Sequence, residues 1–164
     1  MQLDISKILA LDGERLDFEG ETEFLPVTFL GSVFTFPVKA ALKGNVVNDG
    51  GIFLLHMTVT GTAETACARC GAPARESFEF DLDEKLIKSG EAADDDAAVI
   101  EGSVINLDEF AVNGFLMNAP SRFLCSEECK GLCPVCGKNL NEGECSCETE
   151  GTDPRFDILN DLKF

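Results

Sequence analysis

Eight cysteines in four close pairs constrain the fold of this chain more than any other feature of its 164 residues. The pairs are Cys67 and Cys70, Cys125 and Cys129, Cys133 and Cys136, and Cys145 and Cys147. A structural zinc ion takes four soft ligands in a tetrahedron and leaves no position open. A turn with two residues between its thiols brings both sulfurs to one edge of such a metal. The spacing therefore predicts two structural Zn²⁺ sites, each made of four thiolates.

The redox compartment decides whether closely paired thiols become disulfides or metal ligands. The segment from Met1 to Ala10 holds Asp4 and a single lysine, and it lacks the basic start and apolar stretch of a signal peptide. No run of about 18 apolar residues occurs, so we expect no membrane span. We therefore expect a cytoplasmic chain with reduced cysteines, which favours metal over disulfides.

The distances between the pairs along the chain suggest how the eight cysteines divide. Gly137 follows one pair, where a glycine lets the backbone turn back tightly, and the stretch from Gly137 to Glu144 is long enough for a loop to return. The first predicted site, here called the tail site, consists of Cys133, Cys136, Cys145 and Cys147. By subtraction, the second predicted site, called the clip site because it would tie the tail to the β-rich region, consists of Cys67, Cys70, Cys125 and Cys129. Two other groupings stay open: Cys129 and Cys133 exchange roles, or Cys125 and Cys129 join Cys133 and Cys136.

Alternating apolar residues predict strands in the first half of the chain. Apolar side chains fall on every second position from Phe34 to Leu42 and again from Phe53 to Val59, with Asn48-Asp49-Gly50-Gly51 between them. Asparagine, aspartate and glycine tolerate the positive φ of a tight turn, so this pattern predicts a β-hairpin. The alternation resumes from Phe78 to Leu82, which places the first cysteine pair at a tight connection between two strands.

A helix is predicted from about residue 107 to residue 117. Asn106 is a suitable N-cap and Glu109 stands three residues later, much as in a capping box. Gly114 lowers the helix propensity of this segment. The apolar residues that recur at helical spacing are Leu107, Phe110, Ala111 and Phe115.

Together these elements predict an α+β fold, with an antiparallel, hairpin-based sheet, open or barrel-like, one or two packed helices and a zinc-stabilised C-terminal tail. We expect a β-rich domain over residues 1–120 and a cysteine-rich zinc-binding module over residues 121–152, which holds few large apolar side chains and needs metal to fold. A short C-terminal helix over residues 153–164 would begin at Asp153-Pro154. Residues 88–97, with their run of three aspartates, are predicted to form a solvated loop.

The net charge of −17 argues against a dedicated nucleic-acid binder and favours a basic partner. One rival hypothesis is nevertheless a zinc-ribbon protein that binds nucleic acid. Its candidate contacts are Arg69, Arg75, Arg122, Lys130 and Lys138. If the chain does not bind nucleic acid, we expect the three arginines to offset the negative charge of the nearby thiolates.

A second rival hypothesis is a thiol redox protein or sensor that uses Cys67 and Cys70. An iron–sulfur cluster would also use four thiolates. His56, the only histidine, lies in the polar phase of its strand and is predicted to be a surface or partly buried side chain. No catalytic set of side chains can be assembled from the sequence, so we do not expect an enzyme.

Three segments of the chain resemble the YceD family, the large ribosomal RNA subunit accumulation proteins. They are Cys67-Ala68-Arg69-Cys70 after a hairpin, the helix that begins near Leu107 and is followed by a proline, and the tail CSEECKGLCPVCGKNLNEGECSC with the later DPRFDILNDL. The resemblance extends from about Phe34 to the C-terminus. It implies a cytoplasmic, non-enzymatic factor in large ribosomal subunit biogenesis that affects 23S ribosomal RNA accumulation or processing. Read with the acidic charge, it implies a basic ribosomal protein or pre-ribosomal particle as the partner and leaves direct RNA binding open.

Overall fold

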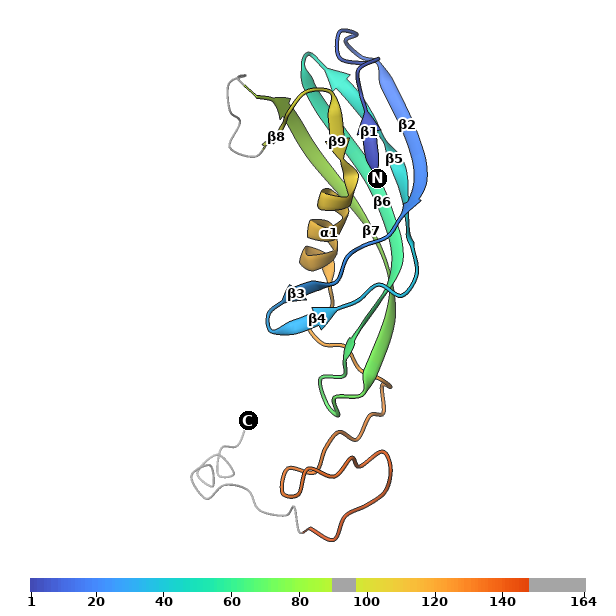
Figure 1. The fold of residues 1–164 in the computed structure, drawn as a ribbon, viewed down its shortest axis with the longest axis vertical. Helices are drawn as coiled ribbons and strands as arrows, with labels where there is room; N and C mark the ends of the chain where they lie inside the picture. The colour runs from blue at the N-terminus through green and yellow to red at the C-terminus, as the bar shows by residue number, and fades with distance from the viewer. Residues whose placement is uncertain (90–96, 148–164) are drawn as a thin grey trace, which may run out of the picture.

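A single curled sheet forms the body of the computed structural model, which describes residues 1–89 and 97–147. Neighbouring strands are antiparallel except for the last pair, which is parallel. In spatial order the strands are β2 (Arg15–Thr22), β5 (Ala40–Asp49), β6 (Ile52–Ala66), β7 (Pro73–Lys88) and β8 (Ala97–Ile100). The sheet curves as a half-barrel and does not close, because β2 and β8 remain its two ends (Figure 1). This architecture, mostly sheet with one helix in the described residues, agrees broadly with the predicted α+β class.

One face of the sheet, here called the inner face, is covered by a helix and two small two-stranded sheets (Figure 1). They are α1 (Leu107–Asn118), β1 (Gln2–Asp4) paired with β9 (Val104–Asn106), and β3 (Val27–Phe29) paired with β4 (Ser32–Phe34). Phenylalanine rings fill the space between them. The ring of Phe115 on α1 lies 5.6 Å from that of Phe34, 5.2 Å from that of Phe36 and 4.9 Å from that of Phe78, measured between centroids. This aromatic cluster joins α1 to β7 and to the loop before β5.

The predicted hairpin is confirmed as β5 and β6, which pair antiparallel along their shared length. Gly50 and Gly51 close its turn with φ values of 59° and 98°, a conformation that favours glycine. The prediction of one strand from Phe34 to Leu42 is wrong. Pro37, which has no amide hydrogen to donate to a ladder, lies between β4 and β5 and separates them.

The predicted helix is confirmed as α1, with Asn106 at its N-cap position. The side chain of Asn106 makes no capping hydrogen bond. A β-carbon added at Gly114 would lie 2.7 Å from Cε2 of Phe80 and 3.2 Å from Cδ2 of Leu82. Gly114 therefore allows α1 to approach β7 closely, which explains why a residue of low helix propensity stands in its middle.

Two predictions lie outside the described residues: the helix over residues 153–164 and the three aspartates of the predicted loop. The division of the chain into a β-rich domain and a cysteine-rich module stays a prediction. Among the described residues, no helix is long and apolar enough to cross a membrane.

Candidate metal sites

The turn between β6 and β7 carries the first cysteine pair and has a specific hydrogen-bond pattern. The amide of Cys67 donates to the carbonyl of Ala72 at 2.7 Å, and the amide of Gly71 donates back to the carbonyl of Cys67 at 2.9 Å. The amide of Arg69 points at the sulfur of Cys67, at 3.4 Å. Gly71 has a φ of 73°, which a residue with a β-carbon adopts only with strain. The turn therefore places the sulfur of Cys67 where it can accept a hydrogen bond from the amide of Arg69.

The third cysteine pair sits on a second copy of the same turn. The amide of Cys133 donates to the carbonyl of Lys138 at 2.8 Å, and the amide of Gly137 donates to the carbonyl of Cys133 at 2.9 Å. The amide of Val135 lies 3.4 Å from the sulfur of Cys133, and Gly137 also has a φ of 73°. Two cysteines with two residues between them and a following glycine therefore produce the same local structure in two places of the molecule.

The structure gathers the eight sulfurs into two groups of four with the same members as the two predicted sites, and metal binding at either group stays a prediction. Within each group all four sulfurs lie within 4.8 Å of one another. The clip site holds Cys67, Cys70, Cys125 and Cys129, and the tail site holds Cys133, Cys136, Cys145 and Cys147. The structure assembles neither alternative grouping among these eight described residues. Each group could hold a metal ion.

Distances in the clip site fit tetrahedral coordination better than disulfides. The sulfurs of Cys67 and Cys129 are 3.8 Å apart, and those of Cys70 and Cys125 are 3.5 Å apart. Four sulfurs at about 2.3 Å from a central zinc ion would be roughly 3.8 Å from one another. A disulfide would bring two sulfurs to about 2.05 Å, and all eight cysteines are free thiols in this structure. The residues present therefore fit a bound metal.

The acidity of the thiols points to the same conclusion. The amide of Cys125, followed by that of Arg69, lowers the pKa of Cys67 to about 6. In the same site, the hydrogen bond that the Cys125 thiol shares with Cys129 contributes most to raising the pKa of Cys125 to about 12. Four crowded thiols cannot all ionise without a cation, because each thiolate disfavours the next. A divalent metal would supply that charge.

The tail site has the same division between an acidic and a weakly acidic thiol. The amides of Cys136 and Val135 lower the pKa of Cys133 to about 6. The hydrogen bond that the thiol of Cys147 shares with Cys136 contributes most to raising the pKa of Cys147 to about 12. In the tail site the turn itself lowers the pKa of its leading cysteine, whereas in the clip site the amide of Cys125, from the second segment, contributes most. Each group of four retains protons that a metal would displace.

Arg69 connects the first turn to the segment that brings Cys125 and Cys129. Its Nη1 donates to the carbonyl of Cys129 at 2.8 Å and to the carbonyl of Glu127 at 3.2 Å. Its own carbonyl accepts a hydrogen bond from the amide of Leu132 at 3.2 Å. The arginine between the two cysteines therefore positions the opposite half of the clip site.

Asn141 links the two sites, although nothing in the sequence distinguishes it as a functional residue. Its Nδ2 donates to the sulfur of Cys129 at 3.3 Å, and its Oδ1 accepts from the amide of Lys130 at 2.8 Å. Asn141 lies in the loop of the tail site, yet it contacts a sulfur of the clip site. No spacing rule in the sequence marks it, because the contact depends on how that loop folds back in space.

Three of the five candidate nucleic-acid contacts have partners within the protein. Besides Arg69, the guanidinium of Arg75 forms an ion pair with Glu64, and Nζ of Lys138 donates to the carbonyl of Glu144 at 2.7 Å. His56, as predicted, is a surface side chain, and its Nδ1 lies 2.7 Å from a carboxylate oxygen of Asp83. Arg69, Arg75 and Lys138 therefore each make a contact within the protein.

Comparison with known proteins shows which family the chain resembles. A family model described as "Large ribosomal RNA subunit accumulation protein YceD" matches residues 55–163, a range that includes all eight cysteines. The chain is 30% identical over 126 residues to uncharacterized proteins of Mycobacterium bovis and of two strains of Mycobacterium tuberculosis. The alignment covers 74% of this chain and 59% of each relative, so the chain spans about three fifths of the length of the curated relatives it matches. No solved structure matches it.

Proposed function

The chain belongs to the YceD family of large ribosomal RNA subunit accumulation proteins, and from this premise we propose that it is a non-enzymatic factor in large ribosomal subunit biogenesis. It affects the accumulation or processing of 23S ribosomal RNA by binding a basic ribosomal protein or a pre-ribosomal particle. In this proposal the chain is an acidic scaffold held in shape by two zinc ions, and it works in the cytoplasm.

The observation that carries the proposal is the pair of four-sulfur groups within the range matched by the family model. Cys67, Cys70, Cys125 and Cys129 would hold one zinc ion, and Cys133, Cys136, Cys145 and Cys147 would hold the other. Four protein ligands leave no open position for a substrate, which is typical of structural zinc. When bound, the metal would neutralise thiolates and cross-link segments. In the clip site it would join residues that are 55 positions apart in the chain.

Charge supports a basic partner. The chain carries −17, and each site of four thiolates and one Zn²⁺ would carry a further charge of about −2. A surface of that sign repels phosphate backbones and attracts proteins rich in lysine and arginine. The internal contacts of Arg69, Arg75 and Lys138 also weigh against a zinc-ribbon protein that binds nucleic acid.

The arrangement of sulfurs favours metal over redox chemistry. A thiol oxidoreductase needs one accessible, acidic cysteine with one partner. Cys67 is buried, 4% exposed, and shares its site with three other thiols. A scaffold therefore accounts for all eight cysteines, whereas a redox pair accounts for two.

Affinity capture from a ribosome-containing lysate tests the proposed function. The zinc-loaded chain is immobilised beside an acidic protein of similar charge, and capture is repeated at graded salt with and without ribonuclease. We expect large-subunit proteins or particles to be retained at low salt and released as salt rises. Retention of RNA without any ribosomal protein would contradict the proposal.

A further inference from the structure

The strand β7 has an open edge along most of its length. It pairs with β6 from Pro73 to Leu86, but β8 pairs only with Lys85 to Lys88 (Figure 1). Over residues 73–84, no strand among the described residues lies on the second side of β7. Such an edge presents unpaired backbone N–H and C=O groups, to which another extended chain can bind.

A groove follows this open edge. It has a volume of about 190 Å³ and is lined by five consecutive residues of β7, from Glu76 to Phe80. Consecutive residues of a strand point to opposite faces, so a hollow lined by five in a row runs along the edge. Its other wall is the end of α1 and the segment that follows: Phe115, Asn118, Ala119, Pro120 and Phe123. The groove therefore offers an apolar wall beside an open strand.

The outer face of β7, on the side away from α1, carries a row of carboxylates beside the same edge. Glu79, Asp81 and Asp83 are exposed and occupy alternate positions, roughly 6.6 Å apart along the strand. Asp81 accepts a hydrogen bond from the hydroxyl of Thr58 at 2.6 Å, and Asp83 contacts His56. Within the described residues, no ion pair joins a lysine or arginine to these three carboxylates.

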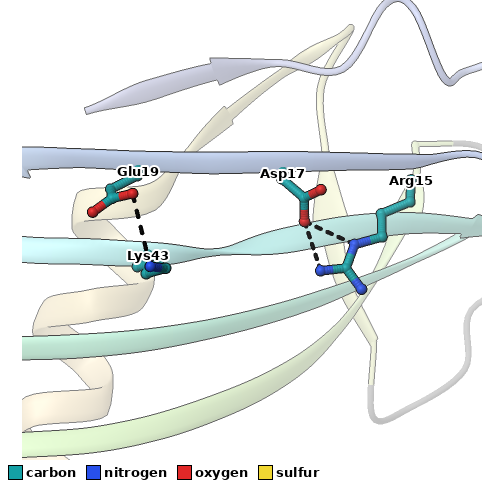
Figure 2. A network of polar contacts seen from close by, with 4 residues as sticks. All are labelled: Arg15, Asp17, Glu19 and Lys43. Carbon is teal, nitrogen blue, oxygen red and sulfur yellow. Dashed lines mark hydrogen bonds and ion pairs between the residues drawn. The ribbon is translucent and has the colours of Figure 1, made fainter.

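The opposite edge strand of the sheet differs in this respect. On β2, Asp17, Glu19 and Glu21 are also exposed at alternate positions. Arg15 pairs with Asp17 at 2.6 Å, and Lys43 pairs with Glu19 at 3.8 Å. Figure 2 shows both pairs beside β2. The hollow beside β2 is lined by Asp17, Phe18 and Glu19 and also extends across β5 and β6 to His56 and Thr58. Each of these two rows has three exposed carboxylates at alternate positions, but Arg15 and Lys43 pair with two of the three on β2.

We propose that the open edge of β7 binds an extended segment of a basic protein, which adds to the sheet as a further strand. Basic side chains at alternate positions of that segment face Glu79, Asp81 and Asp83, and apolar side chains on its opposite face enter the groove where the segment passes residues 76–80. The inference rests on the proposed function and specifies the part of the partner that is recognised. It also identifies which acidic residues would contact the basic partner. The spacing of Glu79, Asp81 and Asp83 matches the two-residue period of side chains on one face of an extended chain.

A synthetic peptide tests this inference without the ribosome. The probe is a capped peptide of alternating lysine and valine, long enough to span residues 73–84, added to the full zinc-loaded chain. Hydrogen exchange measured by NMR should show new protection at alternate amides of β7, those that face away from β6. A lysine–threonine peptide has the same charge and a side chain of nearly the same shape. It should bind more weakly, because its hydroxyl groups would enter the apolar groove.

Two triple variants with equal changes in charge provide the matched comparison. Replacing Glu79, Asp81 and Asp83 by lysine should weaken binding of the lysine–valine peptide about tenfold or more, since three favourable cross-strand pairs become repulsive. Replacing Asp17, Glu19 and Glu21 on β2 by lysine should leave the β7 protection in place, with a smaller loss of affinity. Both variants should retain their metal content, because all six side chains are exposed and none belongs to a cysteine site. Thermal unfolding checks that each variant is folded at the temperature of the binding assay.

Three results would overturn the inference. Equal weakening by both triple variants would show general attraction to an acidic protein. Protection on β2 and not on β7 would place the peptide at the other edge. Protection of the β7 amides before any peptide is added would show that another part of the chain already covers the edge.

The inference and the proposed function fail in different ways. Capture of large-subunit proteins that is unaffected by the β7 variant would contradict the edge site and leave the proposed function standing. Binding of the lysine–valine peptide at β7 without capture of any ribosomal protein would support the edge site and contradict the proposed function.

Discussion

The clip site and the tail site are built on the same turn, but they differ in what surrounds it. In the clip site, Cys67 and Cys129 are buried, 4% and 3% exposed, within the main hydrophobic core. In the tail site, Cys133 is buried outside that core and Cys136 is exposed. The local sequence determines the turn, whereas its importance for the fold depends on where the remaining cysteines come from. We therefore expect the clip site to stabilise the body of the protein and the tail site to fold only its own segment.

The largest effect is expected from Cys67→Ser. It should abolish one metal site, remove a cross-link over a long loop and place a hydroxyl group in the core. The sheet should lose roughly 3 kcal/mol or more of unfolding free energy. Thermal unfolding followed by circular dichroism measures this loss. Cys136→Ser in the tail site is the control, and an equal loss of sheet stability in both variants would remove the distinction between the sites.

Cys133→Ser should affect metal content as strongly but the sheet much less. We expect one bound ion to be lost and the segment after Lys130 to unfold, while β5 and β6 keep their structure. Native mass spectrometry counts the ions, and amide exchange by NMR locates the unfolding. Loss of both ions from this single variant would show that the division into two groups of four is wrong.

The glycines of the two turns allow a matched test of the shared geometry. Gly71 and Gly137 have the same φ of 73°, and a β-carbon at either would meet nothing within 4 Å. Alanine at either position should therefore act through backbone strain alone, at about 1–2 kcal/mol, which weakens metal affinity roughly 5- to 30-fold. Competition with a chelator should show that Gly71→Ala weakens the clip site and Gly137→Ala the tail site.

Gly13→Ala supplies the control for these glycine variants. Gly13 has a φ of 77° and equally open surroundings, far from the cysteines in the sequence. Its replacement should strain the backbone to a similar extent and leave both metal affinities unchanged. A change in metal affinity of this variant would mean that strain anywhere in the chain is transmitted to the sites.

The smallest effect is expected from Asn141→Ala, which tests the contact between the sites. Loss of the hydrogen bond to the sulfur of Cys129 should weaken the clip site by about 1 kcal/mol, or roughly fivefold, although Asn141 lies in the loop of the tail site. Asn141→Asp keeps the acceptor for the amide of Lys130 but loses the donor and adds a negative charge. It should weaken the clip site further than alanine does. Competition with a chelator measures the metal affinity of each site in each variant. Weakening of the tail site alone would contradict the proposal that Asn141 stabilises the clip site through Cys129.

Local patterns in the sequence predicted the parts of this fold that depend on neighbours along the chain. The hairpin of β5 and β6, the helix α1 and the position of the first cysteine pair between two strands all follow from alternation, helical spacing and turn residues. The boundary between β4 and β5 was missed because apolar alternation continues past Pro37, although the two strands belong to different sheets. Apolar residues at every second position indicate extended backbone, but they do not show which strands pair with each other.

Apart from the membership of the clip site, which was inferred by subtraction, features that depend on contacts between distant segments could not be predicted. The close approach of α1 to β7 explains Gly114 only after both elements are placed. The contact of Asn141 with Cys129 depends on the path of a loop, and the open edge of β7 depends on the order of strands in the sheet. In the sequence, the alternating carboxylates of β2 and β7 look alike, and the structure distinguishes them by the ion pairs of Arg15 and Lys43 and by the groove beside β7.

Native mass spectrometry of the full chain, purified without oxidation, tests the central claim most directly. We predict two zinc ions per chain and eight cysteines that become reactive toward alkylating reagents only after chelation. A chain with no bound metal, or one whose mass shows four disulfides, would contradict the account of a scaffold held by two metal sites.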